Sequence, residues 1–265
     1  MIRIESPDDP RTAGFRDIRE RDLTGREGLF VAEGEVVLRV LASPASLCRT
    51  RAVLLAENRL AGLADVVGAL PPQTPVYAAP QAVLDGIAGF HLHRGILALG
   101  EKPAPTPLAE RLAGLPEQSL VVMACGIGNH DNIGGIFRNA AAFGADAVLL
   151  DRGCCDPFYR KAIRVSVGAV LRTPMTTGLE PLAGVEALGA AGFTVLAMTP
   201  GAGRTLEEIP RNPRIAVVLG SEGPGLPDSL IARCTPVGIR MSGGFDSLNV
   251  GTAGAIALHH FARQA

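Results

Sequence analysis

Hydrophobic positions after residue 118 fall in short unbroken runs separated by longer mixed segments. The runs are SLVVMACG (119–126), AVLLD (147–151), FTVLAMTP (193–200), IAVVLG (215–220) and VGIRM (237–241). Apolar runs without polar alternation are typical of strands buried on both faces of a parallel sheet. Helical patterns separate several of these runs, and a helix is expected over 246–263. The pattern therefore predicts an α/β fold with a parallel sheet.

The first hundred residues alternate in the same way over shorter spans. Strands are expected over 29–34, 51–56, 76–79 and 95–100, and helices over 11–24, 35–43 and 58–70. Three prolines then fall within EKPAPTP, and proline disfavours both helix and sheet. The predicted organisation is a small α/β domain over 1–104, a linker over 105–118 with a short helix after Pro107, and a second domain over 119–265.

Composition narrows the class of protein. The chain has 265 residues, is 47% hydrophobic and carries a formal net charge of −1. Its start is polar and charged, and it has no apolar run of about 20 residues, so neither a signal peptide nor a membrane span is expected. The five cysteines (48, 125, 154, 155 and 234) are odd in number and fit no zinc spacing. These features predict a reduced, cytoplasmic protein.

Three glycine-rich segments each follow an expected strand. They are GIGNHDNIGG (126–135), GSEGPG (220–225) and SGGFDS (242–247). Parallel α/β sheets bind ligands beyond the carboxyl ends of their strands, so these loops lie where a ligand is expected. None gives the dinucleotide pattern G-x-G-x-x-G, and Asp151 is a weak candidate for a ribose-binding acid. A nicotinamide-dependent oxidoreductase is therefore a minor alternative, and no phosphate-binding or hydrolase motif is present.

A few polar residues stand out against these apolar surroundings. Asn132 is expected to be the N-cap of the helix over 132–145. Arg138 lies in the same helix, where a lone arginine is usually a solvated charge, but because this helix is otherwise almost wholly apolar, an anionic substrate is a candidate partner. Glu222 directly follows an apolar strand. Asp246, Ser247 and Asn249 stand together at the start of the last helix, where a cap explains only one of them.

The segment 158–179 is the clearest local cluster of positive charge. It carries Arg160, Lys161, Arg164 and Arg172 and no acid, which favours a contact with RNA phosphates, although a solvated helix face gives the same pattern. Arg16, Arg19, Arg26 and Arg39 are candidates to extend such a surface into the N-terminal domain.

Three segments together resemble a known family. DNIGGIFRNAAAFGA, VVLGSEGPGLP and IRMSGGFDSLNVGTAGAIAL are similar to motifs 1, 2 and 3 of the SpoU (TrmH) RNA ribose methyltransferases of the SPOUT superfamily, in the same order. The resemblance covers residues 119–265. REGLFVAEGEVVLRVL resembles the start of the small α/β substrate-binding domain, itself similar to an RNA-binding ribosomal protein, that often precedes the catalytic one.

The resemblance implies a fold, a cofactor and a site. The C-terminal domain would be a trefoil-knotted α/β domain that works as a homodimer and methylates a ribose 2′-hydroxyl in rRNA or tRNA. S-adenosylmethionine would bind at Gly220, Ile239 and Leu248, with Met198, Thr199, Leu219 and Met241 as neighbours. The polar site residues would be Asn132, Arg138, Glu222, Ser247 and Asn249, with Arg138 on the phosphate beside the target ribose. No metal is implied.

The sequence also departs from the family pattern. Asn129-His130-Asp131 replaces the usual Asp-Pro pair before motif 1, Arg240-Met241 replaces Pro-Met in motif 3, and Gly251 stands where a serine is common. These departures leave a second hypothesis open, a non-catalytic RNA-binding member acting in ribosome assembly.

Overall fold

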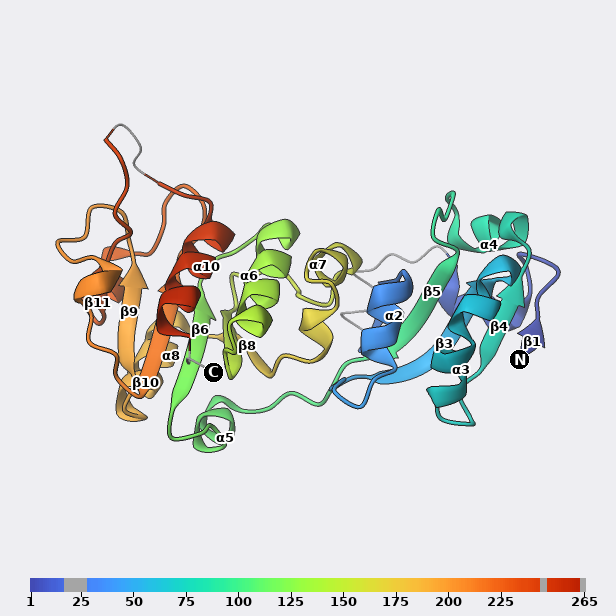
Figure 1. Ribbon diagram of the computed structural model, residues 1–265, viewed down its shortest axis with the longest axis horizontal. Coiled ribbons are helices and arrows are strands. Elements are labelled where there is room, and N and C mark those ends of the chain that lie inside the picture. Colours follow the sequence, from blue (N-terminus) through green and yellow to red (C-terminus); the bar gives the residue numbers. More distant parts are fainter. Residues whose placement is uncertain (17–27, 244–246, 263–265) are drawn as a thin grey trace. The chain divides into compact units, whose positions relative to one another are not determined.

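The chain forms two compact units. The computed structural model describes residues 1–16, 28–243 and 247–262 (Figure 1). The first unit comprises Met1–Pro103 and Asp156–Arg172, and the second comprises Ala104–Cys155 and Thr173–Ala265. Arg19, Arg26 and Asp246, which the sequence offered as candidates, lie outside the described residues.

The first unit is built on a five-stranded mixed sheet. Its strand order is β1-β4-β3-β5-β2, in which β5 runs antiparallel to β3 and β2 and the other pairs are parallel. The strands are β1 (Ile2–Arg3), β2 (Leu29–Glu33), β3 (Arg49–Ala56), β4 (Val76–Ala79) and β5 (Ile96–Glu101). Strands β2 to β5 therefore lie close to where the apolar runs predicted them.

Short helices complete this unit. They are η1 (Pro10–Phe15), α2 (Glu35–Leu41), η3 (Glu57–Arg59), η4 (Ala61–Leu63), α3 (Ala64–Ala69), α4 (Gln81–Ala88), α7 (Arg160–Val165) and η5 (Ala169–Leu171). The prediction of a single helix over 58–70 is wrong, since two 3-10 turns precede α3. The core contains Phe15, Leu54, Leu84, Leu92 and Leu97, all at most 2% exposed.

Residues 156–172 belong to the first unit, although the sequence placed them in the domain over 119–265. The ring of Phe158 lies 5.3 Å from that of Phe30, centroid to centroid. Lys102 Nζ is 2.7 Å from Asp156 Oδ2, and the Leu47 amide donates to the Leu171 carbonyl at 2.8 Å. Apolar burial against β2 and α2 thus decides the position of this segment, which local sequence pattern does not reveal.

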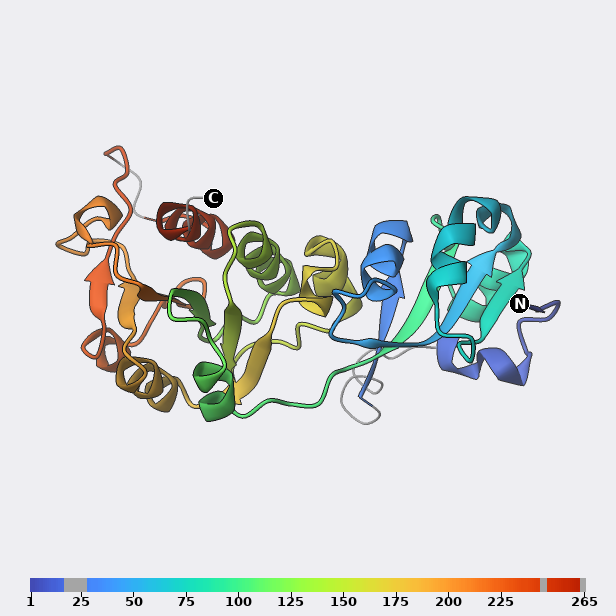
Figure 2. The ribbon, with the colours of Figure 1, turned by 60° about the horizontal axis from the view of Figure 1, so that its bottom comes forward.

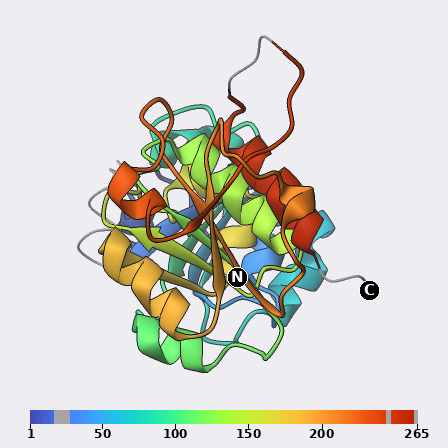
Figure 3. The same cartoon turned by 90° about the vertical axis from the view of Figure 1, so that its left-hand side faces the viewer.

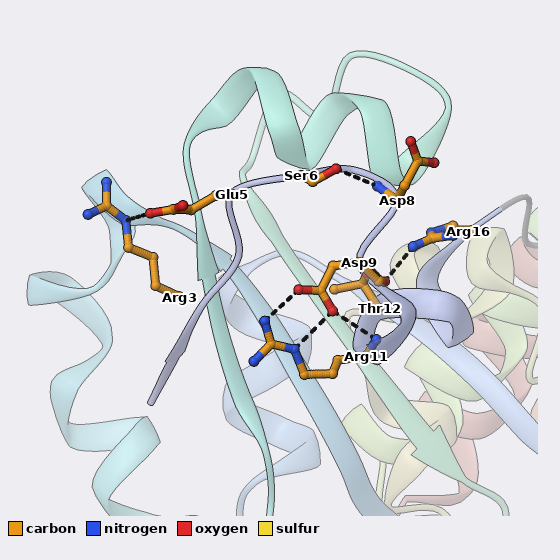
Figure 4. A network of polar contacts seen from close by, with 8 residues as sticks. All are labelled: Arg3, Glu5, Ser6, Asp8, Asp9, Arg11, Thr12 and Arg16. Atoms are coloured by element: carbon orange, nitrogen blue, oxygen red, sulfur yellow. Dashed lines mark hydrogen bonds and ion pairs between the residues drawn. The ribbon is translucent and has the colours of Figure 1, made fainter.

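Two of the arginines proposed to extend an RNA surface already have partners in this unit. Arg16 donates to the Asp9 carbonyl, and Arg11 forms a pair with the Asp9 carboxylate (Figure 4). Hydrogen bonds from Arg11 lower the pKa of Asp9 to about 2. Arg39 Nη1 lies 2.6 Å from Asp65 Oδ2, and its Nη2 lies 3.0 Å from Glu35 Oε1. Arg39 is therefore paired with two carboxylates, whereas the Asp9 carbonyl holds the Arg16 side chain without neutralising its charge.

The second unit is built on a six-stranded sheet that is parallel throughout. Its order is β11-β9-β10-β6-β7-β8, and every strand pair in it is parallel. The strands are β6 (Ser119–Ala124), β7 (Ala147–Asp151), β8 (Met175–Leu179), β9 (Thr194–Met198), β10 (Arg214–Leu219) and β11 (Thr235–Val237). The parallel α/β architecture predicted from the apolar runs is confirmed, whereas the last strand ends four residues earlier than expected.

Helices cover both faces of this sheet. They are α5 (Leu108–Ala113), α6 (His130–Ala142), α8 (Pro181–Ala190), η6 (Leu206–Glu208), α9 (Asp228–Ile231) and α10 (Val250–Phe261). Figures 2 and 3 show α6 and α10 side by side on one face and α5 and α8 on the other. The expected linker thus contains the short helix predicted after Pro107, and that helix is part of the second unit. The pairing of α6 with α10 brings the first glycine-rich segment next to the start of the last helix.

Candidate functional site

Helix α6 begins earlier than the sequence suggested. Its N-cap is Asn129, whose Oδ1 accepts from the Asp131 amide at 2.9 Å, so the prediction that Asn132 caps this helix is wrong. Asn132 lies instead within the first turn, where only 6% of its surface is exposed. An amide buried in this way must find hydrogen-bond partners in the protein.

Asn132 finds these partners in the other two motifs. Its Nδ2 donates to Glu222 Oε1 at 2.5 Å, and its Oδ1 accepts from Asn249 Nδ2 at 2.9 Å. Asn249 Nδ2 also lies 3.3 Å from Glu222 Oε1. Three residues separated by 90 and 117 positions therefore form one closed network, with a single carboxylate oxygen accepting from two amides.

Asn249 has a second task in helix α10. Its Oδ1 accepts from the amides of Gly251 and Thr252 at 2.9 and 3.2 Å, which makes it the N-cap. The helix therefore starts at Val250 rather than at 246. One side chain both caps α10 and, through its other amide atom, joins the network.

A cavity of about 600 Å³ opens beside this network in the second unit. Its walls come from the ends of β9 and β10, the loop after β10, the segment after β11 and the start of α10. The seven positions predicted to hold the cofactor all line it: Met198, Thr199, Leu219, Gly220, Ile239, Met241 and Leu248. Glu222, Ser247 and Asn249 line it too, whereas Asn132 touches it only through the network.

The loop after β10 folds back tightly on itself to form one wall of the cavity. The Gly225 amide donates to the Ser221 carbonyl at 3.1 Å, and Gly225 has a φ of 70°. A Cβ at Gly220 would lie 2.5 Å from both Gly225 C and Leu226 N, closer than such atoms can approach. Glycine at 220 therefore lets the loop close over the end of the strand.

Asp151 and Cys154 hold the loop after β6 in place through hydrogen bonds. Asp151 Oδ1 accepts from the amides of Gly126 and Gly153 at 2.9 and 3.0 Å, which explains its position without any ribose. Cys154 Sγ donates to the Ala124 carbonyl at 3.3 Å and accepts from the Ile127 amide at 3.4 Å. Burial raises the pKa of the Cys154 thiol to about 12, so it stays protonated and able to donate.

This chain is similar to proteins of one known family. Residues 119–259 match the SpoU rRNA methylase family. The chain belongs to this family. An uncharacterized tRNA/rRNA methyltransferase of Mycobacterium bovis is 39% identical over 271 residues, spanning 97% of this chain and 90% of that protein. The family predicted from the three motifs is thereby confirmed, and the oxidoreductase alternative is set aside.

Two solved structures share the fold over nearly the whole chain. An RNA 2′-O ribose methyltransferase is 26% identical, with a TM-score of 0.75 and coverage of 98% of this chain and 97% of that one. The SpoU methyltransferase AviRb from Streptomyces viridochromogenes, solved with AdoMet, is 22% identical, with a TM-score of 0.79 and coverage of 95% and 96%. Both units of this SpoU-family chain are therefore represented in known structures.

Arg138 and Ser247 differ from the other predicted polar residues. Both are exposed, and neither forms a hydrogen bond or ion pair with any residue that the structure describes. Within the described part of the chain, Arg138 is therefore an unpaired cation on the helix that carries Asn132. The neighbouring Asn139, which the sequence did not single out, donates from Nδ2 to the Gly251 carbonyl at 2.9 Å and so fastens α6 to α10.

The four residues predicted to contact RNA lie in the first unit, outside the unit that holds the cavity. Arg160 Nη1 lies 3.3 Å from Glu33 Oε2, and its guanidinium carbon lies 4.8 Å from the centre of the Phe90 ring. Lys161, Arg164 and Arg172 are exposed. The Arg160 side chain therefore packs against Glu33 and Phe90 of the same unit as well as adding positive charge to it.

Within the described residues, no group of three or more His, Cys, Asp or Glu side chains could hold a metal ion. Among the described helices, none is both long and apolar enough to cross a membrane. The polar contacts of the site join Asn132, Glu222 and Asn249, and of these three residues only Asn132 is buried.

Replacing Asn249 separates its two tasks. Asn249→Ala loses both the cap and the network, whereas Asn249→Ser keeps an oxygen that can cap α10 but is too short to reach Glu222. We expect the alanine variant to lower the free energy of unfolding by about 1 kcal/mol more than the serine variant. Urea unfolding of both variants measures the difference, and equal losses would show that the cap contributes nothing.

Proposed function

We propose that this SpoU-family chain transfers a methyl group from S-adenosylmethionine to the 2′-hydroxyl of a ribose in structured rRNA or tRNA. One observation carries the proposal: a single cavity gathers all seven predicted cofactor positions next to the Asn132–Glu222–Asn249 network. The family supports it, as do a relative described as a tRNA/rRNA methyltransferase and a structural neighbour described as an RNA 2′-O ribose methyltransferase.

The cavity suits the proposed cofactor. Its volume of about 600 Å³ lies within the usual range for sites of small molecules and cofactors. Apolar side chains such as Leu219 and Ile239 suit a purine ring, and the backbone of the loop after β10 offers amides and carbonyls for its polar edge. The structural neighbour AviRb was solved with AdoMet. When bound, S-adenosylmethionine supplies an electrophilic methyl group on a sulfonium.

The chain must then position a ribose hydroxyl and remove its proton. A neutral hydroxyl is a weak nucleophile, so catalysis requires proton transfer as the new bond to carbon forms. Arg138 is exposed and unpaired within the described chain, which suits it to bind the phosphate beside the target ribose. Its guanidinium stays protonated and has no free position to accept a proton, so a phosphate oxygen held by Arg138 takes the proton from the 2′-hydroxyl.

The remaining polar residues hold the site in shape. Asn132 donates a hydrogen bond to Glu222 and accepts one from Asn249. Because Asn249 also caps α10, these contacts connect Asn132 and Glu222 to the start of that helix. This arrangement fixes the backbone at Leu248, which lines the cofactor cavity. The exposed Ser247 hydroxyl at the same wall is left to orient the ribose.

Mapping of 2′-O-methylated nucleotides tests the proposal. RNA from cells with and without the protein is compared by mass spectrometry, and the purified full chain is then given tritiated S-adenosylmethionine and the RNA lacking the mark. We expect one ribose methylation to depend on the protein and to be restored in vitro. Methylation of a base alone would contradict the proposal. An absence of cofactor binding by calorimetry at millimolar concentration would favour the non-catalytic, ribosome-assembly alternative.

We further propose the assembly that the family resemblance implies, which is a trefoil knot in the second unit, a homodimer and RNA contact by the first unit, together with the cytoplasmic location expected from the composition. The loop after β10 and the segment leading into α10 line one cavity, which supports close threading of the chain end. Light scattering on the purified chain tests the dimer, since it should give twice the chain mass of 27.5 kDa.

A further inference from the structure

The loop Gly89–Gly95 of the first unit is firmly anchored at its middle. Leu92 is fully buried in the core between the sheet and α4. Its amide donates to Asp85 Oδ1 at 2.9 Å, and its carbonyl accepts from Gln81 Nε2 at 3.1 Å. Because both backbone groups and the side chain of Leu92 are held, the loop has a defined conformation before any partner binds.

This anchor leaves the residues around Leu92 on the surface. Phe90 is 43% exposed, which is high for a large apolar side chain. His91 and His93 are exposed as well, and their rings meet edge to face with centroids 4.5 Å apart. His91 Nδ1 lies 2.7 Å from Asp85 Oδ2, which fixes its ring. Three aromatic rings are therefore presented to solvent within four residues.

Arginines lie among these rings. The Arg160 guanidinium lies 4.8 Å from the centre of the Phe90 ring, and Arg59 Nε donates to the Arg94 carbonyl at 3.1 Å. The exposed Arg94 side chain lies against the backbone of Gly34, where an added Cβ would be 2.9 Å from Nη1. Of the nearby carboxylates, Glu33 pairs with Arg160 and Glu57 with Arg3. Arg59 and Arg94 have no carboxylate partner among the described residues.

We propose that this surface, formed by Phe90, His91, His93, Arg94, Arg59 and Arg160, binds unpaired bases of the RNA substrate. The inference rests on the proposed function and adds how the RNA is recognised. Unstacked bases bind proteins by stacking on aromatic rings and guanidinium planes, while neighbouring cations contact the phosphates. The alternation of rings and arginines fits this chemistry, whereas a protein partner would favour a broader apolar patch. A paired helix presents no free base faces, so the surface selects single-stranded segments.

Binding of two short RNA probes by the full-length chain tests the inference. The probes are a fluorescein-labelled 12-nucleotide oligouridylate and a blunt 12-base-pair RNA duplex, measured by anisotropy at constant salt. Phe90→Leu keeps an apolar side chain without a ring, and Arg94→Ala removes a cation. We expect each to weaken oligouridylate binding by roughly ten-fold, and Phe90→Leu to change duplex binding less than two-fold. Leu47→Ala, which changes another exposed apolar residue of the same unit, should bind as the unaltered chain does.

The outcomes separate this surface from the proposed function. Oligouridylate binding that is unchanged in both Phe90→Leu and Arg94→Ala, or lowered equally in Leu47→Ala, overturns the surface. So does an equal loss of duplex and single-strand binding in Phe90→Leu. Calorimetry with S-adenosylmethionine should be unaffected in all variants, which verifies the second unit, and urea unfolding verifies that the first unit remains folded. If the variants lose oligouridylate binding while the unaltered chain methylates no RNA, the surface stands and the proposed function fails.

Discussion

Arg138→Ala is expected to reduce RNA methyl transfer by at least about 10²–10³-fold, the loss typical when one charge-stabilising group is removed from an active site. Arg138 is exposed on α6 and has no partner within the described residues, so its removal breaks no contact that holds the fold. Cofactor binding and the free energy of unfolding should therefore stay close to their original values. Single-turnover methylation with saturating cofactor measures the effect on the chemical step.

Two further variants make the Arg138 result specific. Arg138→Lys keeps the charge but loses the planar fork that binds a phosphate through two donors, so we expect only partial activity. Arg233→Ala removes another exposed arginine of the same unit, one that lies 3.6 Å from Glu186, and should leave turnover unchanged. Unaltered turnover in Arg138→Ala would exclude this residue from the mechanism. Another group would then have to remove the proton from the 2′-hydroxyl.

The central strands of the second unit could be predicted from the sequence because burial on both faces leaves an unmistakable apolar run. The AVLLD run coincides with β7, and the IAVVLG run overlaps β10 within one residue at each end. Strand β8 (Met175–Leu179) gave no such signal because it is an edge strand rich in threonine. Its Thr176 hydroxyl donates to the Thr106 carbonyl, a contact 70 residues away that no local pattern encodes.

The helix starts show why local rules mislead near a functional site. Asn129, Asp131 and Asn132 are all good capping residues, and the sequence alone does not say which one caps. Asn129 caps α6, and Asn132 is thereby free to enter the interior and meet Glu222. The family motifs named Asn132, Glu222 and Asn249 together, but their mutual hydrogen bonds depend on the packing of α6 on α10.

Gly220→Ala is expected to abolish detectable binding of S-adenosylmethionine. The added Cβ would lie 2.5 Å from backbone atoms of Gly225 and Leu226, and backbone held in a tight loop cannot yield as a flexible side chain does. The loop after β10 must therefore move, and with it one wall of the cavity. Overpacking of this kind also costs about 1–3 kcal/mol of folding free energy. Calorimetry measures the affinity, and urea unfolding measures the stability.

Two control variants distinguish a local change in the cavity wall from a general loss of folding. Gly128→Ala adds the same methyl group where no atom lies within 4 Å, so it should bind the cofactor normally. Ile239→Ala removes atoms from another part of the cavity lining without any collision and should weaken cofactor binding by roughly ten-fold, because an apolar side chain that a ligand covers contributes about 1–2 kcal/mol. If Gly220→Ala remains folded and binds as tightly as the unaltered chain, the cofactor does not lie against this loop. If Ile239→Ala also binds normally, the cofactor lies outside this cavity, and the proposed roles of the seven lining positions fail together.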